Sequence, residues 1–398
     1  MQEVNNIKES IKRLIKWVNT YGYSGWDPYD WGSSPLASKL PYTFNFILSQ
    51  VNLYSPFNFR PLLGIKKGIS NKELALFAQA YLLNYVIEKD ENYKDRSFEL
   101  LSELYKRRIE WGEGVSWASY YFTFVRKGHV LSPNNPDIIA TAEALKAYTL
   151  AYHLFKDESF KEISLRIIEE IKRNFIVVID EDKKYVKYYP QESEKIVFNV
   201  SGLVLSSFAY FIQYIENDEG IKKIGTQIAK LLMDFQKKQG FWPYSYYLNE
   251  KKYKIQNDYH QGFIIVGLAD FYPYYSGDKE NIKKCIERGV YFYKNYQFSS
   301  AGWSYYRPPK LKYPIDIHNQ AQGIITFSKL YKLFKNPLYV DFAIKIARWT
   351  IKNMQSHEGY FYTHRWPFMV NKIPYVRWGQ AWMMLALANL LEAMEVDT

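Results

Sequence analysis

A pattern that recurs about every sixty residues constrains this chain more than any other feature. Each copy begins with a glycine and aromatic residues, continues through an irregular polar loop and ends in an apolar helix rich in small side chains. These helices are expected to begin at residues 137, 199, 258, 316 and 377, which are 62, 59, 58 and 61 residues apart. A period of this length accommodates two helices and their loops, so the chain is predicted to stack helix pairs on one another.

Two kinds of helix alternate along the chain. One kind is amphipathic, as over residues 220–235, with an apolar stripe on one side. The other kind is apolar nearly all round, as over residues 197–215, and such a helix must be buried on every side. The first kind, expected to be outer, begins near residues 5, 95, 158, 220, 279 and 339, and the second, inner kind near 71, 135, 197, 257, 316 and 377.

We therefore predict an all-α fold, an (α/α)6 toroid of six inner and six outer helices. About six helix-pair repeats would form a single domain over residues 1–398. Aromatic loops, with candidate short hairpins at 242–247 and 303–306, are expected over one mouth of the ring. The alternative is an open α-solenoid, which would leave the all-round apolar helices half exposed.

The charge balance narrows the class of partner. The 52 Lys and Arg residues exceed the 41 Asp and Glu residues and give a net charge of +11, which argues against a cationic partner. Acidic polysaccharide, nucleic acid and phosphorylated lipid remain as candidate partners. Nucleic acid is not expected, because the lysines are spread over the outer helices as solvated faces. The single cysteine, Cys285, excludes an intramolecular disulfide and a thiolate-rich metal site, and no Gly-rich phosphate loop is present.

The chain carries no pattern typical of export or membrane insertion. Residues 1–17 are polar and amphipathic rather than apolar, as a signal peptide would be. The uncharged stretch 197–215 is nearly long enough to span a bilayer, but it contains Asn199 and several serines and resembles other half-polar stretches of the chain. We expect a cytoplasmic protein without a transmembrane segment.

Three helix starts carry a family resemblance. They read Asp258-Tyr-His-Gln-Gly-Phe, Pro314-Ile-Asp-Ile-His-Asn-Gln-Ala-Gln and Pro374-Tyr-Val-Arg-Trp-Gly-Gln-Ala-Trp. Together with Pro136-Asp-Ile-Ile-Ala-Thr-Ala-Glu-Ala, they resemble proteins encoded in bacterial and archaeal polysaccharide-biosynthesis clusters. These are α/α toroids of the terpenoid cyclase or prenyltransferase-like type. The resemblance runs from about Trp26 to Leu391, and it implies the toroid fold and a polysaccharide context.

A second, local resemblance covers Trp242 to His260. This segment is similar to the C-terminal domain of glucuronyl C5-epimerases, which carry an aromatic-rich loop followed by a Tyr-His helix start. The chain lacks the Asp-rich acid motif that a terpene cyclase uses to ionise its substrate, so a cyclase activity is disfavoured.

In a toroid, helix starts on one side of the ring converge on one mouth. The candidate catalytic residues are therefore Asp258, His260, Asp316, His318 and Arg377. The Asp-x-His pair occurs twice at the same repeat position, although the chain has only six histidines. As an alternative, each aspartate simply caps its helix, with Gln261 completing a capping box at Asp258. No metal is expected, since Asp-x-His at a helix start does not aim both groups at one point.

The candidate substrate-binding residues are polar groups at helix starts and aromatic residues of the loops. Arginine forks bind carboxylates with two hydrogen bonds, and aromatic rings stack on sugars, although many aromatics in a chain with 18% of them are ordinary core. The candidates are Asp137, Asn199, Trp242, Tyr244, Trp303, Tyr305, Tyr306, Arg307, Tyr360, Trp378 and Trp26.

These candidates favour a carbohydrate-active protein that acts on an acidic polysaccharide or a lipid-linked glycan. We expect a uronate epimerase or lyase without a cofactor, in which Arg377 or Arg307 neutralises the carboxylate and a histidine abstracts the neighbouring proton. His318 is expected to matter more than His260, because its own repeat also carries Arg307.

Two alternatives stay open. A glycoside hydrolase would use two carboxylates from Asp137, Asp258 and Asp316. A non-catalytic component of a polysaccharide assembly system would bind a glycan or a polyprenyl chain. The sequence does not indicate an oligomeric state.

Overall fold

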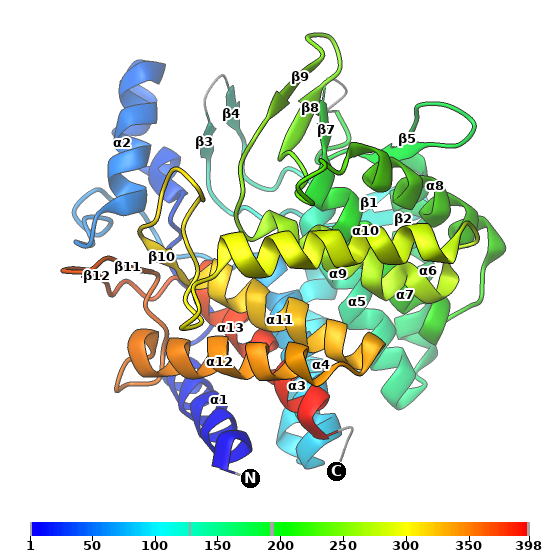
Figure 1. Cartoon of the computed structure of the whole chain (residues 1–398). Coiled ribbons are helices and arrows are strands. Elements are labelled where there is room, and N and C mark those ends of the chain that lie inside the picture. The colour runs from blue at the N-terminus through cyan, green and yellow to red at the C-terminus, as the bar shows by residue number, and fades with distance from the viewer. Residues whose placement is uncertain (1, 127–128, 192–194, 396–398) are drawn as a thin grey trace.

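Six inner helices form a closed ring in the computed structural model, which describes residues 2–126, 129–191 and 195–395. Each inner helix packs on the next, and the last packs on the first, so the ring closes and an open solenoid is excluded. Figure 1 labels these helices. They are α3 (Asn71–Glu88), α5 (Ile138–Phe155), α7 (Phe198–Tyr214), α9 (His260–Phe271), α11 (Ile317–Phe334) and α13 (Ala381–Glu395).

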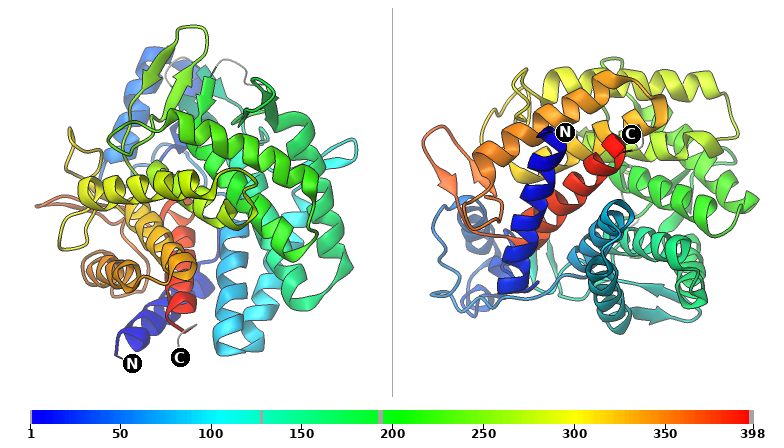
Figure 2. Two further views of the ribbon diagram at one scale, coloured as in Figure 1. Left: turned by 45° about the vertical axis from the view of Figure 1, so that its right-hand side comes forward. Right: turned by 90° about the horizontal axis from the view of Figure 1, so that it is seen from below.

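An outer helix covers each inner one. Within the described ranges the pairs are α4 on α3, α6 on α5, α8 on α7, α10 on α9, α12 on α11 and α1 on α13. The first and last helices of the chain thus lie side by side, as the view from below in Figure 2 shows. The predicted (α/α)6 toroid is confirmed. The outer helices are α1 (Gln2–Tyr21), α4 (Glu91–Lys106), α6 (Glu158–Glu170), α8 (Glu219–Phe235), α10 (Lys279–Phe292) and α12 (Pro337–Met354).

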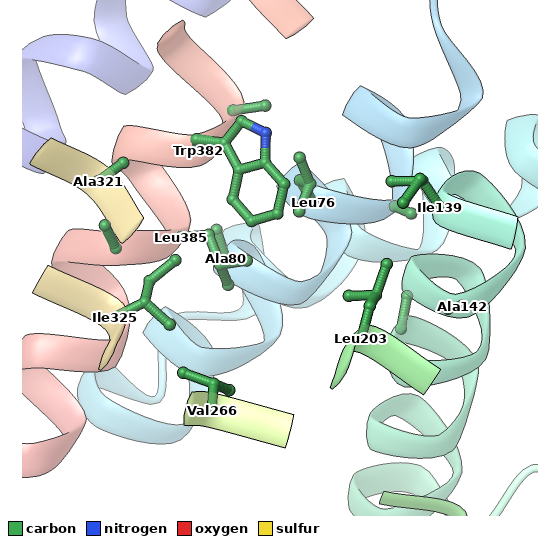
Figure 3. Close-up of a cluster of buried hydrophobic side chains, with 14 of the residues drawn as sticks. Leu76, Ala80, Ile139, Ala142, Leu203, Val266, Ala321, Ile325, Trp382 and Leu385 are labelled. Carbon is green, nitrogen blue, oxygen red and sulfur yellow. The ribbon is translucent and has the colours of Figure 1, made fainter. Parts of the chain in front are cut away.

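The core fills the space between the outer and inner helices and continues into the middle of the inner ring. Figure 3 shows buried apolar side chains from all of the inner helices meeting there. Small residues such as Ala80, Ala142 and Ala321 let the helices approach, while Trp382 projects from α13 toward the other inner helices. This explains why the inner helices are apolar nearly all round. The uncharged stretch that includes α7 is buried in this way, and none of the described helices has the length and hydropathy needed to cross a bilayer.

The glycine that opens each aromatic loop is required by its backbone. Gly240, Gly302 and Gly359 have φ angles of 99°, 94° and 109°, which residues other than glycine rarely adopt. A Cβ atom on Gly240 or Gly359 would also lie 2.3 or 2.1 Å from a backbone oxygen of an outer helix. The glycines therefore fix the loops tightly against the outer ring.

Short antiparallel strands join the helices. Several of them stand above one end of the ring, as predicted (Figure 1). The expected hairpin at 242–247 appears as β8 and β9, but the segment 303–306 forms only one isolated bridge, between Ser304 and Phe298. The strands are β1 (Ile109–Trp111), β2 (Gly114–Ser116), β3 (Phe124–Arg126), β4 (His129–Leu131), β5 (Ile176–Val178), β6 (Lys184–Val186), β7 (Lys195–Val197), β8 (Ser245–Tyr247), β9 (Lys252–Lys254), β10 (Ile315–Asp316), β11 (His364–Arg365) and β12 (Val370–Asn371).

One helix, α2 (Tyr42–Tyr54), was not predicted and lies outside the ring. It packs against the 3-10 turn Asp30–Ser33 and against β3, and it projects beside the same end of the ring as the hairpins (Figure 1). Residues 22–70, which contain α2, fall before the first inner helix and outside the sixty-residue repeat.

Candidate active site

A cavity of about 240 Å³ opens at the end of the ring where the inner helices begin. Each inner helix contributes a residue from its first turn, or from the π-helical turn Val376–Gln380 that precedes α13. These residues are Lys72, Ile139, Asn199, His260, His318 and Arg377. Residues about sixty positions apart in the sequence thus become neighbours, as the repeat requires.

The rest of the lining is aromatic and basic apart from Leu203 and Gln256. Lys254 and Arg307 add two more positive charges to those of Lys72 and Arg377. Among the described residues that line the cavity there is no Asp or Glu. The cavity is therefore suited to an anionic ligand. The aromatic lining consists of Tyr29, Tyr120, Phe124, Tyr188, Tyr189, Tyr244, Tyr259, Phe263, Trp378 and Trp382.

His318 lies between two aromatic rings. Its imidazole stacks on Tyr259, with 4.1 Å between ring centroids, and on Trp382, at 4.9 Å. Neither of its ring nitrogens has a hydrogen-bond partner among the described residues, although the side chain is only 3% exposed. Burial, together with the positive charges of Lys72, His260 and Arg377, holds the pKa of His318 well below its ordinary value. The imidazole is therefore neutral at pH 7.

His260 lies on the same Tyr259 ring, with 4.2 Å between centroids. Its Nδ1 makes a short hydrogen bond to the Asp258 carboxylate, which fixes the ring and directs Nε2 away from that carboxylate. Burial alone would raise the pKa of Asp258, but attraction to His260 and Arg307 lowers it below its ordinary value. Asp258 is thus an ionised group that orients and supports the imidazole.

Lys72 is a site residue that the sequence analysis missed. It is 5% exposed, and its Nζ lies 5.9 Å from the centroid of the Trp382 ring. Burial and the nearby Arg377 lower the pKa of Lys72 to about 7, although Asp137 acts in the opposite direction. The repeat could have identified Lys72. The first inner helix was expected near residue 71, and Lys72 occupies the same position at its start as the other site residues do in their repeats.

Arg377 and Arg307 were both expected to clamp the substrate carboxylate, but the structure places them differently. Arg377 is 2% exposed, and its Nε and Nη2 both donate to the carboxylate of Asp27, with Nη2 2.8 Å from Oδ1. Its fork is therefore occupied, and it contributes positive charge to the cavity rather than an open anion clamp. The Arg307 side chain is 37% exposed, with its Nε 3.8 Å from Oδ2 of Asp258. Although it follows the loop of the His318 repeat, Arg307 lies on the side of His260.

The three candidate carboxylates do not line the cavity. Asp137 accepts hydrogen bonds from the backbone of Ile139 and Ala140, which caps α5. Asp258 supports His260, as described above. Asp316 caps α11 and also accepts from Nε2 of His364, at 3.2 Å, and from the indole of Trp378. The alternative interpretation as helix caps thus applies to Asp137 and Asp316, and Asp258 likewise accepts from the backbone N of His260 at the start of α9.

Only some of the aromatic candidates reach the cavity. Tyr244 and Trp378 line it, as does Asn199, whose Oδ1 has no partner among the described residues. The other aromatic candidates pack against loops and helices outside the cavity lining. Trp242, for example, is fully buried and donates to the backbone oxygen of Leu232. The candidates that do not line the cavity are Trp242, Trp303, Tyr305, Tyr306, Tyr360 and Trp26.

The glutamine found at three of the helix starts has a structural role. The Gln261 side chain bonds the backbone N and O of Trp242, so the expected capping box with Asp258 does not form. Gln320 accepts from the backbone N of Ser304 in the next repeat, and Gln380 from that of Phe361. In all three repeats the glutamine ties the aromatic loop to the inner helix. Its recurrence in the sequence could have indicated this role. No cluster of metal-ligating side chains occurs in the ranges that the structure describes.

Comparison with solved structures shows the same fold in carbohydrate enzymes. The cellobiose 2-epimerase from Bacillus thermoamylovorans B4167 aligns with a TM-score of 0.72 at 13% sequence identity over 99% of each chain. A sugar epimerase from a ruminal bacterium gives 0.67 at 12% identity over 100% of each chain. The α-1,6-mannanase GH76A from Salegentibacter sp. HEL1_6 gives 0.60 at 14% identity over 83% of this chain and 90% of its own.

These similarities show the fold alone, since the identities are low. No protein-family model matches the chain, and no curated protein matches its sequence. The comparisons thus support the toroid fold that the resemblance to polysaccharide-cluster proteins implied. They do not support membership of that family or a relation to C5-epimerases.

Proposed function

We propose that the protein is a carbohydrate-active enzyme that binds an acidic saccharide in this cavity and moves the proton next to its carboxylate. The activity would be that of a uronate epimerase or lyase. One observation carries the proposal: the cavity is lined by cations and nitrogen bases, and by no carboxylate among the described residues. The sugar-epimerase structures of the same fold agree with it.

The competing functions fit the cavity less well. Glycoside hydrolysis uses two carboxyl groups about 5–10 Å apart on either side of the glycosidic bond. Asp137, Asp258 and Asp316 do not line the cavity, and each is instead engaged by backbone or side-chain donors. A polyprenyl-binding funnel would be apolar, whereas this lining carries Lys72, Arg307 and other cations.

The proposed chemistry assigns a role to each lining group. Arg307 pairs with the substrate carboxylate and so stabilises the negative charge that develops when the neighbouring C–H bond breaks. His318 accepts that proton. The bound anion offsets the positive charges around His318 and raises its affinity for the proton. His260, oriented by Asp258, returns a proton to the opposite face in an epimerase, or protonates the leaving oxygen in a lyase.

The binding step is tested by replacing Arg307 with glutamine. We expect the affinity for an acidic oligosaccharide such as an oligogalacturonate to fall about tenfold, because a charge-assisted pair is lost. The affinity for a neutral oligosaccharide of equal length should stay low and unchanged. Arg348→Gln, which alters a 62% exposed side chain paired with Glu3, is the matched control in the same calorimetric titrations. Equal affinity of the wild-type protein for acidic and neutral oligosaccharides would contradict the proposal.

Lys72 predicts the pH dependence of binding. Its pKa of about 7 means that it is charged below pH 7 and neutral above it. An acidic saccharide should therefore bind more tightly near pH 6 than near pH 8, by about fivefold, because the charged lysine attracts it. Calorimetry at both pH values checks this, with Lys72→Met as the comparison. The variant should show a flatter dependence, and an unchanged dependence would rule out Lys72 as its source.

A further inference from the structure

Large apolar side chains are exposed over α2 and the turns on either side of it. Leu62 is 86% exposed and Phe44 59% exposed, although such residues are usually buried in a soluble chain. Figure 1 shows α2 standing out from the ring, so its outer side has no covering element. The exposed side chains of this segment are Leu36, Leu40, Tyr42, Phe44, Ile47, Val51, Phe57, Phe59 and Leu62.

The turn between β11 and β12 adds to this surface. Phe368 is fully exposed there, and Met369 is 39% exposed. The hairpin is tied to the end of α2, because the Asn371 side chain donates to the backbone oxygen of Ser55 and the ring of Tyr54 stacks on His364. Both views place the hairpin and α2 on the same side of the molecule (Figures 1 and 2). We call these two groups of side chains together the apolar face.

The charged residues of the two segments that carry the apolar face all have one sign. Residues 31–68 and 359–375 contain no Asp or Glu, in a chain that has 41 of them. Residues 40–59 carry no charge at all. Exposed lysines lie beside the apolar residues in both segments, at Lys39, Lys66, Lys67 and Lys372. An apolar centre with a cationic border is complementary to a bilayer surface that contains anionic lipid.

We propose that the apolar face docks the protein on the surface of an anionic membrane. The exposed apolar side chains enter the headgroup region, and the lysines pair with lipid phosphates. A second copy of the chain is a poorer occupant, because two such faces would bring lysines together without a carboxylate between them. This docking does not depend on the proposed chemistry.

Docking would also place the cavity near the membrane. The Tyr54 hydroxyl at the end of α2 lies 2.9 Å from the hydroxyl of Tyr306, and the next residue, Arg307, lines the cavity. A saccharide carried on a membrane lipid could then reach the cavity while the protein stays at the surface. The face thus fits a lipid-linked form of the acidic glycan.

The test is co-sedimentation with vesicles of phosphatidylcholine alone and of equimolar phosphatidylcholine and phosphatidylglycerol. We expect the full chain to sediment with the anionic vesicles only, and less so as salt is raised. Leu62→Ser and Phe368→Ser should each weaken this binding about tenfold, since each removes a large apolar side chain from the interface. Leu338→Ser, which changes a 62% exposed residue of α12, is the matched control and should bind as the wild type does.

Three results would overturn the docking proposal. The first is the absence of binding to anionic vesicles, and the second is binding that Leu62→Ser and Phe368→Ser leave unchanged. The third is a dimer, seen by sedimentation velocity, that these substitutions dissociate, since the face would then join two copies. Both residues are exposed and neither lines the cavity, so saccharide affinity should remain in the variants. That readout separates failure of the docking from failure of the proposed function.

Discussion

Replacing His318 with phenylalanine is expected to reduce kcat on an acidic saccharide by about 10³-fold, the usual contribution of a general base. Phenylalanine keeps a ring between Tyr259 and Trp382, so the fold and the saccharide affinity should change little. The imidazole has no hydrogen-bond partner among the described residues that the substitution would leave unpaired. Initial rates and calorimetry on the same preparations separate turnover from binding.

The control for this experiment is His357→Phe, because the side chain of His357 is 89% exposed and lies outside the cavity. It should keep wild-type turnover. A His318→Phe protein with kcat within about tenfold of the wild type would show that another group takes the proton, because general base catalysis contributes at least 10²-fold. His260, supported by Asp258, would then be the next candidate.

Replacing Asp27 with alanine is expected to have the largest effect on stability. Asp27 is 0% exposed and binds both Nε and Nη2 of Arg377, which is itself 2% exposed. Its removal leaves a buried guanidinium without a counter-charge, which costs about 3–5 kcal/mol. Urea denaturation followed by circular dichroism measures the loss.

A double substitution shows whether the unpaired charge is the cause. In Asp27→Ala/Arg377→Met the buried cation is gone together with its partner, so much of the lost stability should return. If Asp27→Ala costs less than about 1 kcal/mol, the pair is not the buried, desolvated contact described above. If the double variant is as unstable as the single one, Asp27 acts mainly through its packing around the site.

The sequence could predict the ring and the place of the site because both follow from the repeat. Equivalent positions of stacked units must lie at equivalent places around a closed ring. Asn199, His260, His318 and Arg377, at four successive helix starts, therefore meet at one mouth. The same phase applied to the first inner helix would have added Lys72.

The direction of each side chain could not be predicted in this way. An aspartate at a helix N-cap turns back to the N–H groups of its own helix, so Asp137 and Asp316 leave the cavity while their neighbours face it. Trp242 turns outward because its loop is pinned by Gln261. The partner of Arg377 could not be predicted for another reason. Asp27 is 350 residues away in the sequence, in a segment without repeats to fix its position.

The most direct test of the proposed function is incubation of the protein with a uronate oligosaccharide in D2O, followed by mass spectrometry and NMR of the sugar. Both an epimerase and a lyase begin by breaking the C–H bond next to the carboxylate. We predict deuterium at that carbon or an unsaturated product, and the loss of both in His318→Phe. Release of saturated fragments without deuterium at that carbon would instead indicate hydrolysis and would contradict proton transfer at the carboxylate.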